Sequence, residues 1–217
     1  MTGARTTTAS RGRIDKRQAI LGAAFTVFAR AGYAQAGVQE IADEAGVAKP
    51  TVYNHFSDKA VLFRHTMAAA AENALQERLA ALEPLVAPGD DLRTTLEGVA
   101  HRLLRYHCDD RSCALRRLLY AEITRFPDVL DIVKEHGAHR LNQAVADRLA
   151  RLTLAGRLCA IDPAQAAEQF MALLTGPMEA RSQMGTRPVD DAEMQAVARA
   201  AVHTFLQVFG AQRAEDL

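Results

Sequence analysis

The chain has 217 residues, of which 49% are hydrophobic, and its 26 basic residues balance 26 acidic ones. This length suits one compact unit or two small ones, and the richness in alanine and leucine predicts a largely helical, cytoplasmic protein. A membrane protein and a secreted protein are both disfavoured, because no segment approaches roughly 20 consecutive apolar residues and the N-terminus lacks an apolar signal region.

The N-terminal third carries the excess positive charge. Residues 1–65 contain a surplus of about four basic side chains, so the remainder is correspondingly acidic. This distribution suits a basic DNA-binding head on an acidic body, since phosphate contacts supply most of the affinity for DNA. Residues 1–13 (MTGARTTTASRGR) are expected to form a flexible basic arm, which is either a plain solvated tail or a segment that lies along the minor groove.

Three helices are expected next. The first runs from about Asp15 to Ala31, and apolar residues at helical spacing predict a short second helix over residues 38–45 that ends at Gly46. Pro50 suits the first turn of the third. Two helices joined by so short a turn form a helix-turn-helix, whose second helix enters the major groove of DNA. The spacing alone also fits an ordinary helical hairpin whose polar residues are merely solvated.

The residues around this hairpin resemble the TetR-like family of one-component transcriptional regulators. Members of that family end a helix with a Phe-x-x-x-Gly-Tyr pattern, here Phe28, Gly32 and Tyr33, and continue with a motif similar to IADEAGVAKPTVYNHFSDKAVL in this chain. The motif covers roughly residues 14–63. The resemblance implies an all-α fold, with a three-helix DNA-binding domain at residues 14–60 and a helical ligand-binding and dimerisation domain at residues 61–217.

The resemblance also implies which side chains face double-stranded DNA. Lys59, at the start of the fourth helix, is expected to hold a phosphate together with the helix N-terminus, and Ser57 and Asp58 are expected to cap that helix. The implied DNA-facing residues are Gln39, Lys49, Pro50, Thr51, Tyr53, Asn54, His55 and Lys59.

The chain departs from the family pattern at three positions. Ala36, Gly37 and Ala48 stand where threonine or serine is usual, which removes hydroxyls that could cap a helix or bind phosphate. In the third helix Val52 and Phe56 are expected to face the core of the head instead of DNA.

Turn and cap signals divide the remaining chain into longer helices. These are expected at about residues 59–82, 91–107, 112–125, 127–155, 163–184 and 190–210. The last two are rich in small and apolar side chains, so they are expected to form either a homodimer interface or an ordinary core. A homodimer would place two recognition helices in successive major grooves of a palindromic operator.

The stretch from Ala114 to Gly176 resembles the C-terminal domain of the AefR-like subgroup. This resemblance implies a small hydrophobic effector that binds between the middle helices, and we expect it to release a repressor from its operator by population shift. Each candidate for lining that pocket could also be a plain core residue. The candidates are Leu103, His107, Leu119, Ile123, Phe170, Leu174 and Met178.

Two other classes of function remain open: a redox or metal sensor that uses the same head, and a helical small-molecule-binding protein. The three cysteines, Cys108, Cys113 and Cys159, are an odd number without metal-site spacing, so they are expected to be reduced and buried. His136 and His139 share a helix face, but a metal site needs three or four ligands. The sequence has no phosphate loop, nucleophile elbow or HExxH motif, so neither a cofactor nor enzymatic activity is expected.

Overall fold

The computed structural model describes residues 5–159 and 162–211, and within these ranges it describes side chains from Ile14 onward. The regular elements of the described chain are helices, and one isolated bridge pairs Leu158 with Gly210. The chain folds into two compact units, which we name the head (residues up to 72, with 117–134) and the body (residues 73–116, with 135 onward). The all-α fold class expected from the sequence is confirmed.

Helix α1 (Arg5–Gln35) begins earlier than the sequence predicted. Residues 5–13 of the expected flexible arm are helical, whereas residues 1–4 lie outside the described chain. Residues 5–15 contain no proline, and extending a formed helix costs far less than starting one. At the other end Gly32 leaves helical geometry, with φ 72° and ψ 167°, so the main helix ends where predicted.

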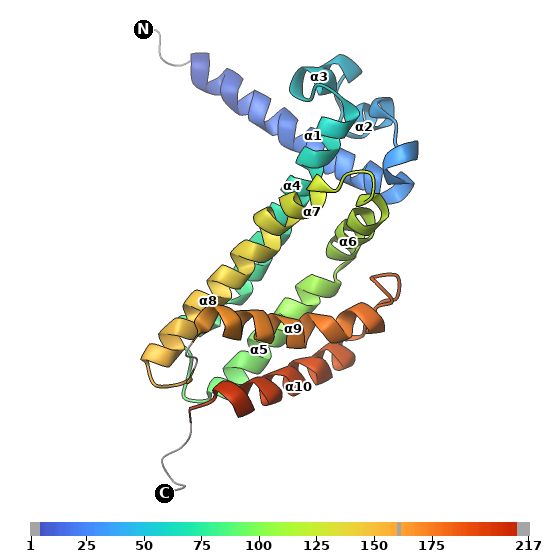
Figure 1. The fold of residues 1–217 in the computed structure, drawn as a ribbon. Coiled ribbons are helices and arrows are strands. Elements are labelled where there is room, and N and C mark those ends of the chain that lie inside the picture. The colour runs from blue at the N-terminus through green and yellow to red at the C-terminus, as the bar shows by residue number, and fades with distance from the viewer. Residues whose placement is uncertain (1–4, 160–161, 212–217) are drawn as a thin grey trace, which may run out of the picture. The chain divides into compact units, whose positions relative to one another are not determined.

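The head contains α2 (Val38–Glu44), α3 (Lys49–His55), the start of α4 (Lys59–Ala81) and α7 (Asp128–Val133), as Figure 1 shows. Four aromatic rings form the centre of its core. The ring of Tyr33 lies 5.1 Å from that of Phe63 and 4.7 Å from that of Phe126, and Phe28 packs edge-on against Phe63 at 5.2 Å. Edge-to-face pairs at such distances stabilise a core beyond the apolar area that they bury.

The head extends beyond the boundary that the motif suggested. The motif predicted a division after residue 60, whereas the compact unit reaches residue 72 and includes residues 117–134. The physical reason is Phe126, which follows α6 (Asp110–Glu122) and is only 6% exposed because it packs into the aromatic core of the head. Arg64 reinforces this packing, since its Nε donates to Asp128 Oδ2 at 2.5 Å.

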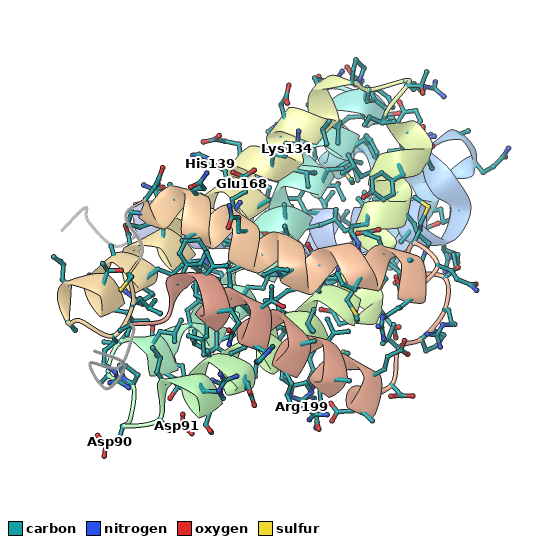
Figure 2. All side chains as sticks on the ribbon, turned by 60° about the horizontal axis from the view of Figure 1, so that its bottom comes forward. Asp90, Asp91, Lys134, His139, Glu168 and Arg199 are labelled. Carbon is teal, nitrogen blue, oxygen red and sulfur yellow. The ribbon has the colours of Figure 1, made fainter. Side chains whose placement is uncertain are left out.

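The body is built from α5 (Leu92–Cys108), α8 (His139–Leu154), α9 (Pro163–Arg181) and α10 (Asp191–Phe209). Helix α10 packs against α5, and α9 packs against both α8 and α10 (Figure 1). Aspartates start three of these helices as N-caps. Asp91, labelled in Figure 2 at the start of α5, accepts from the backbone N–H of Thr94, while Asp162 caps α9 and Asp190 caps α10.

The helix expected over residues 127–155 is divided in the structure. It consists of α7, a π-helical segment (Lys134–Ala138) and α8, so the backbone hydrogen bonds change from i→i+4 to i→i+5 for one turn. A short 3-10 helix (Glu83–Leu85) follows α4. Within the described ranges, none of the helices combines the length and the apolarity that crossing a bilayer would require.

Candidate nucleic-acid interface

The turn between α2 and α3 has the geometry that the sequence predicted. Gly46 has a φ of +65°, its N–H donates to the Asp43 carbonyl at 3.1 Å, and the N–H of Val47 donates to the Ala42 carbonyl at 2.9 Å. These two bonds form a Schellman motif, which satisfies the last carbonyls of α2 and reverses the chain. Backbone hydrogen bonds therefore hold the turn between the two helices, and glycine is favoured at position 46 because the φ angle there is positive.

Replacing Gly46 with alanine should lower the free energy of unfolding by about 1 kcal/mol, because an L-residue is strained at positive φ. An added Cβ would meet nothing within 4 Å, so no steric clash would contribute. Urea denaturation measures the change. The control is Gly22→Ala in α1, which has equally open space, and it should raise stability because alanine is the better helix former. Equal effects of the two substitutions would contradict the positive-φ explanation.

Helix α3 is anchored by one face and exposed on the other. Val52 and Phe56 are 1% and 2% exposed, which confirms them as core residues of the head. The opposite face presents Lys49, Asn54 and Tyr53, the last with 45% of its surface exposed. Within the same set, Pro50 and Gln39 are exposed and Thr51 and His55 are half-buried. The arrangement therefore displays donors and acceptors on a short helix that cannot rotate without exposing its buried anchors.

Lys59 lies at the start of α4, as predicted, but its ammonium group has partners within the head. Its Nζ donates to the Ala34 carbonyl at 3.2 Å and lies 4.6 Å from the centre of the Tyr33 ring. Burial, followed by the nearby Arg125 guanidinium, lowers the pKa of Lys59. Asp58 caps the helix by accepting from the N–H of Val61 at 2.8 Å, whereas the Ser57 hydroxyl donates to Asp58. The cap is therefore the aspartate alone.

One departure from the family pattern has a packing explanation. Ala36 is only 2% exposed, so its methyl group belongs to the core of the head and a hydroxyl there would need a buried partner. Gly37 and Ala48 take up the extended N-cap conformation of α2 and α3 without supplying a side-chain oxygen. The first turn of each helix therefore depends on other groups to satisfy its N–H donors.

The seven residues expected to line an effector pocket are divided between the two units. Leu103, Phe170, Leu174 and Met178 lie together in the body core, each at most 3% exposed. His107 lies in the body as well, one helical turn after Leu103. Leu119 and Ile123 belong to the head instead, so neither compact unit holds all seven.

The cysteines differ in environment. All three are free, and in the described chain Cys113 is buried, Cys108 is half-buried and Cys159 is exposed, so the expectation of burial is wrong for Cys159. Cys159 follows the end of α8, and its backbone N–H donates to the Phe209 carbonyl at 2.8 Å. Burial, followed by the neighbouring Cys113, raises the pKa of Cys108 to about 11. A protonated thiol is a poor nucleophile and a poor metal ligand.

Metal binding finds no support in the described residues, where no three His, Cys, Asp or Glu side chains gather closely enough to hold an ion. His139, which is labelled in Figure 2 and was considered as a ligand together with His136, is an exposed side chain of α8.

Comparison with known proteins identifies the family. Residues 20–66 match the model of bacterial regulatory proteins of the tetR family, and residues 94–211 match the model of the C-terminal domain of AefR-like transcriptional repressors. The chain belongs to the TetR family. A solved structure of a TetR-family transcriptional regulator from Mesorhizobium loti MAFF303099 agrees, with a TM-score of 0.85 and 31% identity over 91% of this chain and 98% of that one.

Two further proteins are similar to this chain over a short segment and over most of its length, respectively. The HTH-type transcriptional activator FasR of Mycolicibacterium smegmatis is 52% identical over 58 residues, a match that spans 24% of this chain and 26% of the relative. The flavonoid-responsive regulator FrrA shares the fold, with a TM-score of 0.70 and 24% identity over 91% of this chain and 98% of that one. The TetR-family chain described here is therefore a DNA-binding transcriptional regulator and not an enzyme.

Proposed function

We propose that this regulator binds a palindromic DNA operator as a homodimer, acts as a repressor in the cytoplasm, and is released by a small hydrophobic effector bound in the body. The proposal rests on the two faces of helix α3. Val52 and Phe56 are buried on one face, and Tyr53 and its polar neighbours are exposed on the other. Side chains at the N-terminal part of such a helix read base edges in the major groove. The similarity of residues 94–211 to the C-terminal domain of AefR-like transcriptional repressors supports repression over activation.

The proposed DNA contacts divide by chemistry. Lys49, Tyr53 and Lys59 would contact phosphates, while Thr51 and Asn54 would hydrogen-bond to base edges. The remaining members of the proposed DNA-facing set are Gln39, Pro50 and His55. Lys59 keeps N–H donors beyond the one that it gives to Ala34, because an ammonium group has three.

The homodimer proposal rests on an apolar groove on the body, between α9 and α10. Its cavity volume is about 470 Å³. The lining residues are Gln169, Ala172, Leu173, Pro177, Thr204, Phe205, Val208 and Phe209. Val208 is 64% exposed, whereas Phe170 of α9 and Val202 of α10 are buried in the core of the body. An exposed apolar strip along two long helices suits a four-helix interface with a second copy.

Selection of binding sites from random duplex DNA tests the proposal. The wild type should enrich a palindrome, and Tyr53→Ala should weaken its binding at least tenfold, or about 1.4 kcal/mol, through loss of a phosphate contact. Tyr53→Phe separates the hydroxyl from the ring. Tyr120→Ala is the matched control, since Tyr120 is 42% exposed in the same unit but lies on α6. Only salt-sensitive binding without sequence preference would contradict operator recognition.

The same selection distinguishes a dimer from a monomer. Val208→Asp should shift the protein to a monomer in sedimentation and should replace the enriched palindrome with weak half-site binding, because the charge would be buried in the interface. Leu154→Asp is the control, since Leu154 is 89% exposed at the end of α8 and lies outside the groove. A Val208→Asp variant that remains dimeric would assign the interface elsewhere. A reporter gene behind the selected site then gives the sign of regulation.

A further inference from the structure

The body contains a cluster of buried polar side chains beside its apolar core. Arg116 of α6 and His107 of α5 have side chains that are 14% and 13% exposed, and both face Glu179 of α9. Arg116 Nη1 donates to the His107 carbonyl at 2.8 Å. Two consecutive helices, α5 and α6, and the more distant α9 therefore bring an imidazole, a guanidinium and a carboxylate together.

Two donor nitrogens of this cluster converge on one carboxylate oxygen without reaching it. Arg116 Nε lies 3.7 Å from Glu179 Oε1, and His107 Nε2 lies 3.8 Å from the same atom. Both separations exceed the range of an N–H···O hydrogen bond. Among the described residues, neither nitrogen has a hydrogen-bond acceptor, although both are buried. A buried donor without an acceptor costs roughly 1–3 kcal/mol, so this arrangement favours an acceptor placed more closely than Glu179.

The imidazole has a defined donor side. His107 Nδ1 lies 3.5 Å from Arg116 Nη1, which can only donate, so the lone pair of His107 is expected on Nδ1 and the proton on Nε2. Burial, followed by the charges of Arg116 and Arg78, lowers the pKa of His107 to about 3, so the ring is neutral. Its Nε2–H therefore points toward Glu179 as a donor.

A second guanidinium makes the surroundings positive. Arg78 of α4 donates to the Ser112 hydroxyl at 3.1 Å, and its Nε is a further buried donor without an acceptor in the described chain. Asp109 is the neighbouring carboxylate, but it already accepts from the N–H and the hydroxyl of Ser112. Glu179 is 37% exposed and is thus the member of the cluster most able to move toward solvent.

We propose that Arg116 and His107 form an anion-binding end of the effector site, and that the effector carries a carboxylate that takes the place of Glu179 between Arg116 Nε and His107 Nε2. This inference rests on the proposed function, since it assigns a chemical class to the effector. Charge-assisted hydrogen bonds from a guanidinium to a carboxylate are among the stronger ones available in a protein.

The neighbouring side chains specify the rest of the ligand. Leu103 lies one turn before His107 on the same face of α5, and it shares the core of the body with Leu174 and Met178 of α9, all at most 3% exposed. The carboxylate therefore adjoins apolar core, so the ligand is an organic acid with an apolar body.

Calorimetry and thermal shift with the full chain test the inference. The probes are acetate, octanoate and benzoate, each paired with its neutral amide. The wild type should bind at least one of these acids in a saturable way and should bind the matching amide at least tenfold more weakly. Arg116→Lys keeps the charge but loses the Nε–H, so it should weaken binding of the acid at least tenfold. Arg199→Gln, an exposed arginine of α10 labelled in Figure 2, is the control and should bind as the wild type does.

The Glu179→Gln variant distinguishes an anion-binding site from a cluster that only stabilises the fold. Removing the competing negative charge should tighten binding of the acid about tenfold, while circular dichroism confirms that each variant is folded. The inference is overturned if none of the acids binds the wild type or Glu179→Gln better than its amide, if Arg116→Lys binds as tightly as the wild type, or if Glu179→Gln leaves affinity unchanged. Operator affinity is measured separately. Operator binding without acid binding defeats the inference alone, whereas acid binding that leaves operator affinity unchanged defeats effector control.

Discussion

Phe126→Ala is expected to lower the free energy of unfolding by about 3–5 kcal/mol, the usual range when a buried phenylalanine is truncated. The ring is 6% exposed and lies 4.7 Å from that of Tyr33 and 5.1 Å from that of Phe63. Truncation would leave a cavity in a close-packed aromatic core and would also remove the face over which the Arg64 guanidinium lies at 5.2 Å. Urea denaturation followed by circular dichroism measures the change.

The loss of stability in Phe126→Ala should be seen first around the aromatic core of the head. Hydrogen exchange in Phe126→Ala should accelerate first at amides of α1 and α4 that pack around Tyr33 and Phe63, because these share the aromatic core. Ile14→Ala removes a large apolar side chain that is 59% exposed on α1, and it should change stability by less than about 0.5 kcal/mol. A Phe126→Ala protein as stable as Ile14→Ala would mean that residues 117–134 are dispensable for the head.

Helix ends and helix starts could be predicted from the sequence, because they depend on residues that are close together in the chain. Gly46 followed by Pro50 specified a helix end and a helix start within a few residues, and the structure confirms both. Asp91, Asp162 and Asp190 mark the first turns of α5, α9 and α10 for a similarly local reason, since an aspartate oxygen at an N-cap accepts N–H groups two or three residues ahead.

Features set by contacts distant in sequence could not be predicted in this way. Nothing near Phe126 indicates that its ring packs against Tyr33, which is more than ninety residues earlier in the chain. The same holds for His107, Arg116 and Glu179, whose helical patterns reveal an apolar face but not which polar side chains that face will meet. The division of the predicted effector-pocket residues, with Leu119 and Ile123 in the head and the other five in the body, was likewise not visible in the sequence.

The second large effect is expected in the dependence of stability on pH. Burial and the guanidinium groups of Arg116 and Arg78 lower the pKa of His107 to about 3 in the folded protein, against about 6.5 in the unfolded chain. Between about pH 6.5 and pH 3 the His107 imidazole is therefore protonated in the unfolded chain but neutral in the folded protein. The contribution of His107 to stability is fully present above pH 6.5 and is lost progressively as the pH falls toward 3. Glu179 is the carboxylate that faces the ring, with its Oε1 at 3.8 Å from Nε2.

Between pH 7 and pH 5, this linkage amounts to about 2 kcal/mol of lost stability, since one pKa unit corresponds to about 1.4 kcal/mol. His107→Gln keeps a neutral side chain of similar length that cannot bind the proton, so its free energy of unfolding should fall by about 2 kcal/mol less than that of the wild type over the same range. His203→Gln, which removes an exposed histidine of α10, should follow the wild-type profile. Urea denaturation at several pH values provides the comparison. Parallel profiles for the wild type and His107→Gln would show that the imidazole is protonated with little penalty in the fold, which would also remove the argument for a neutral Nε2–H donor facing Glu179.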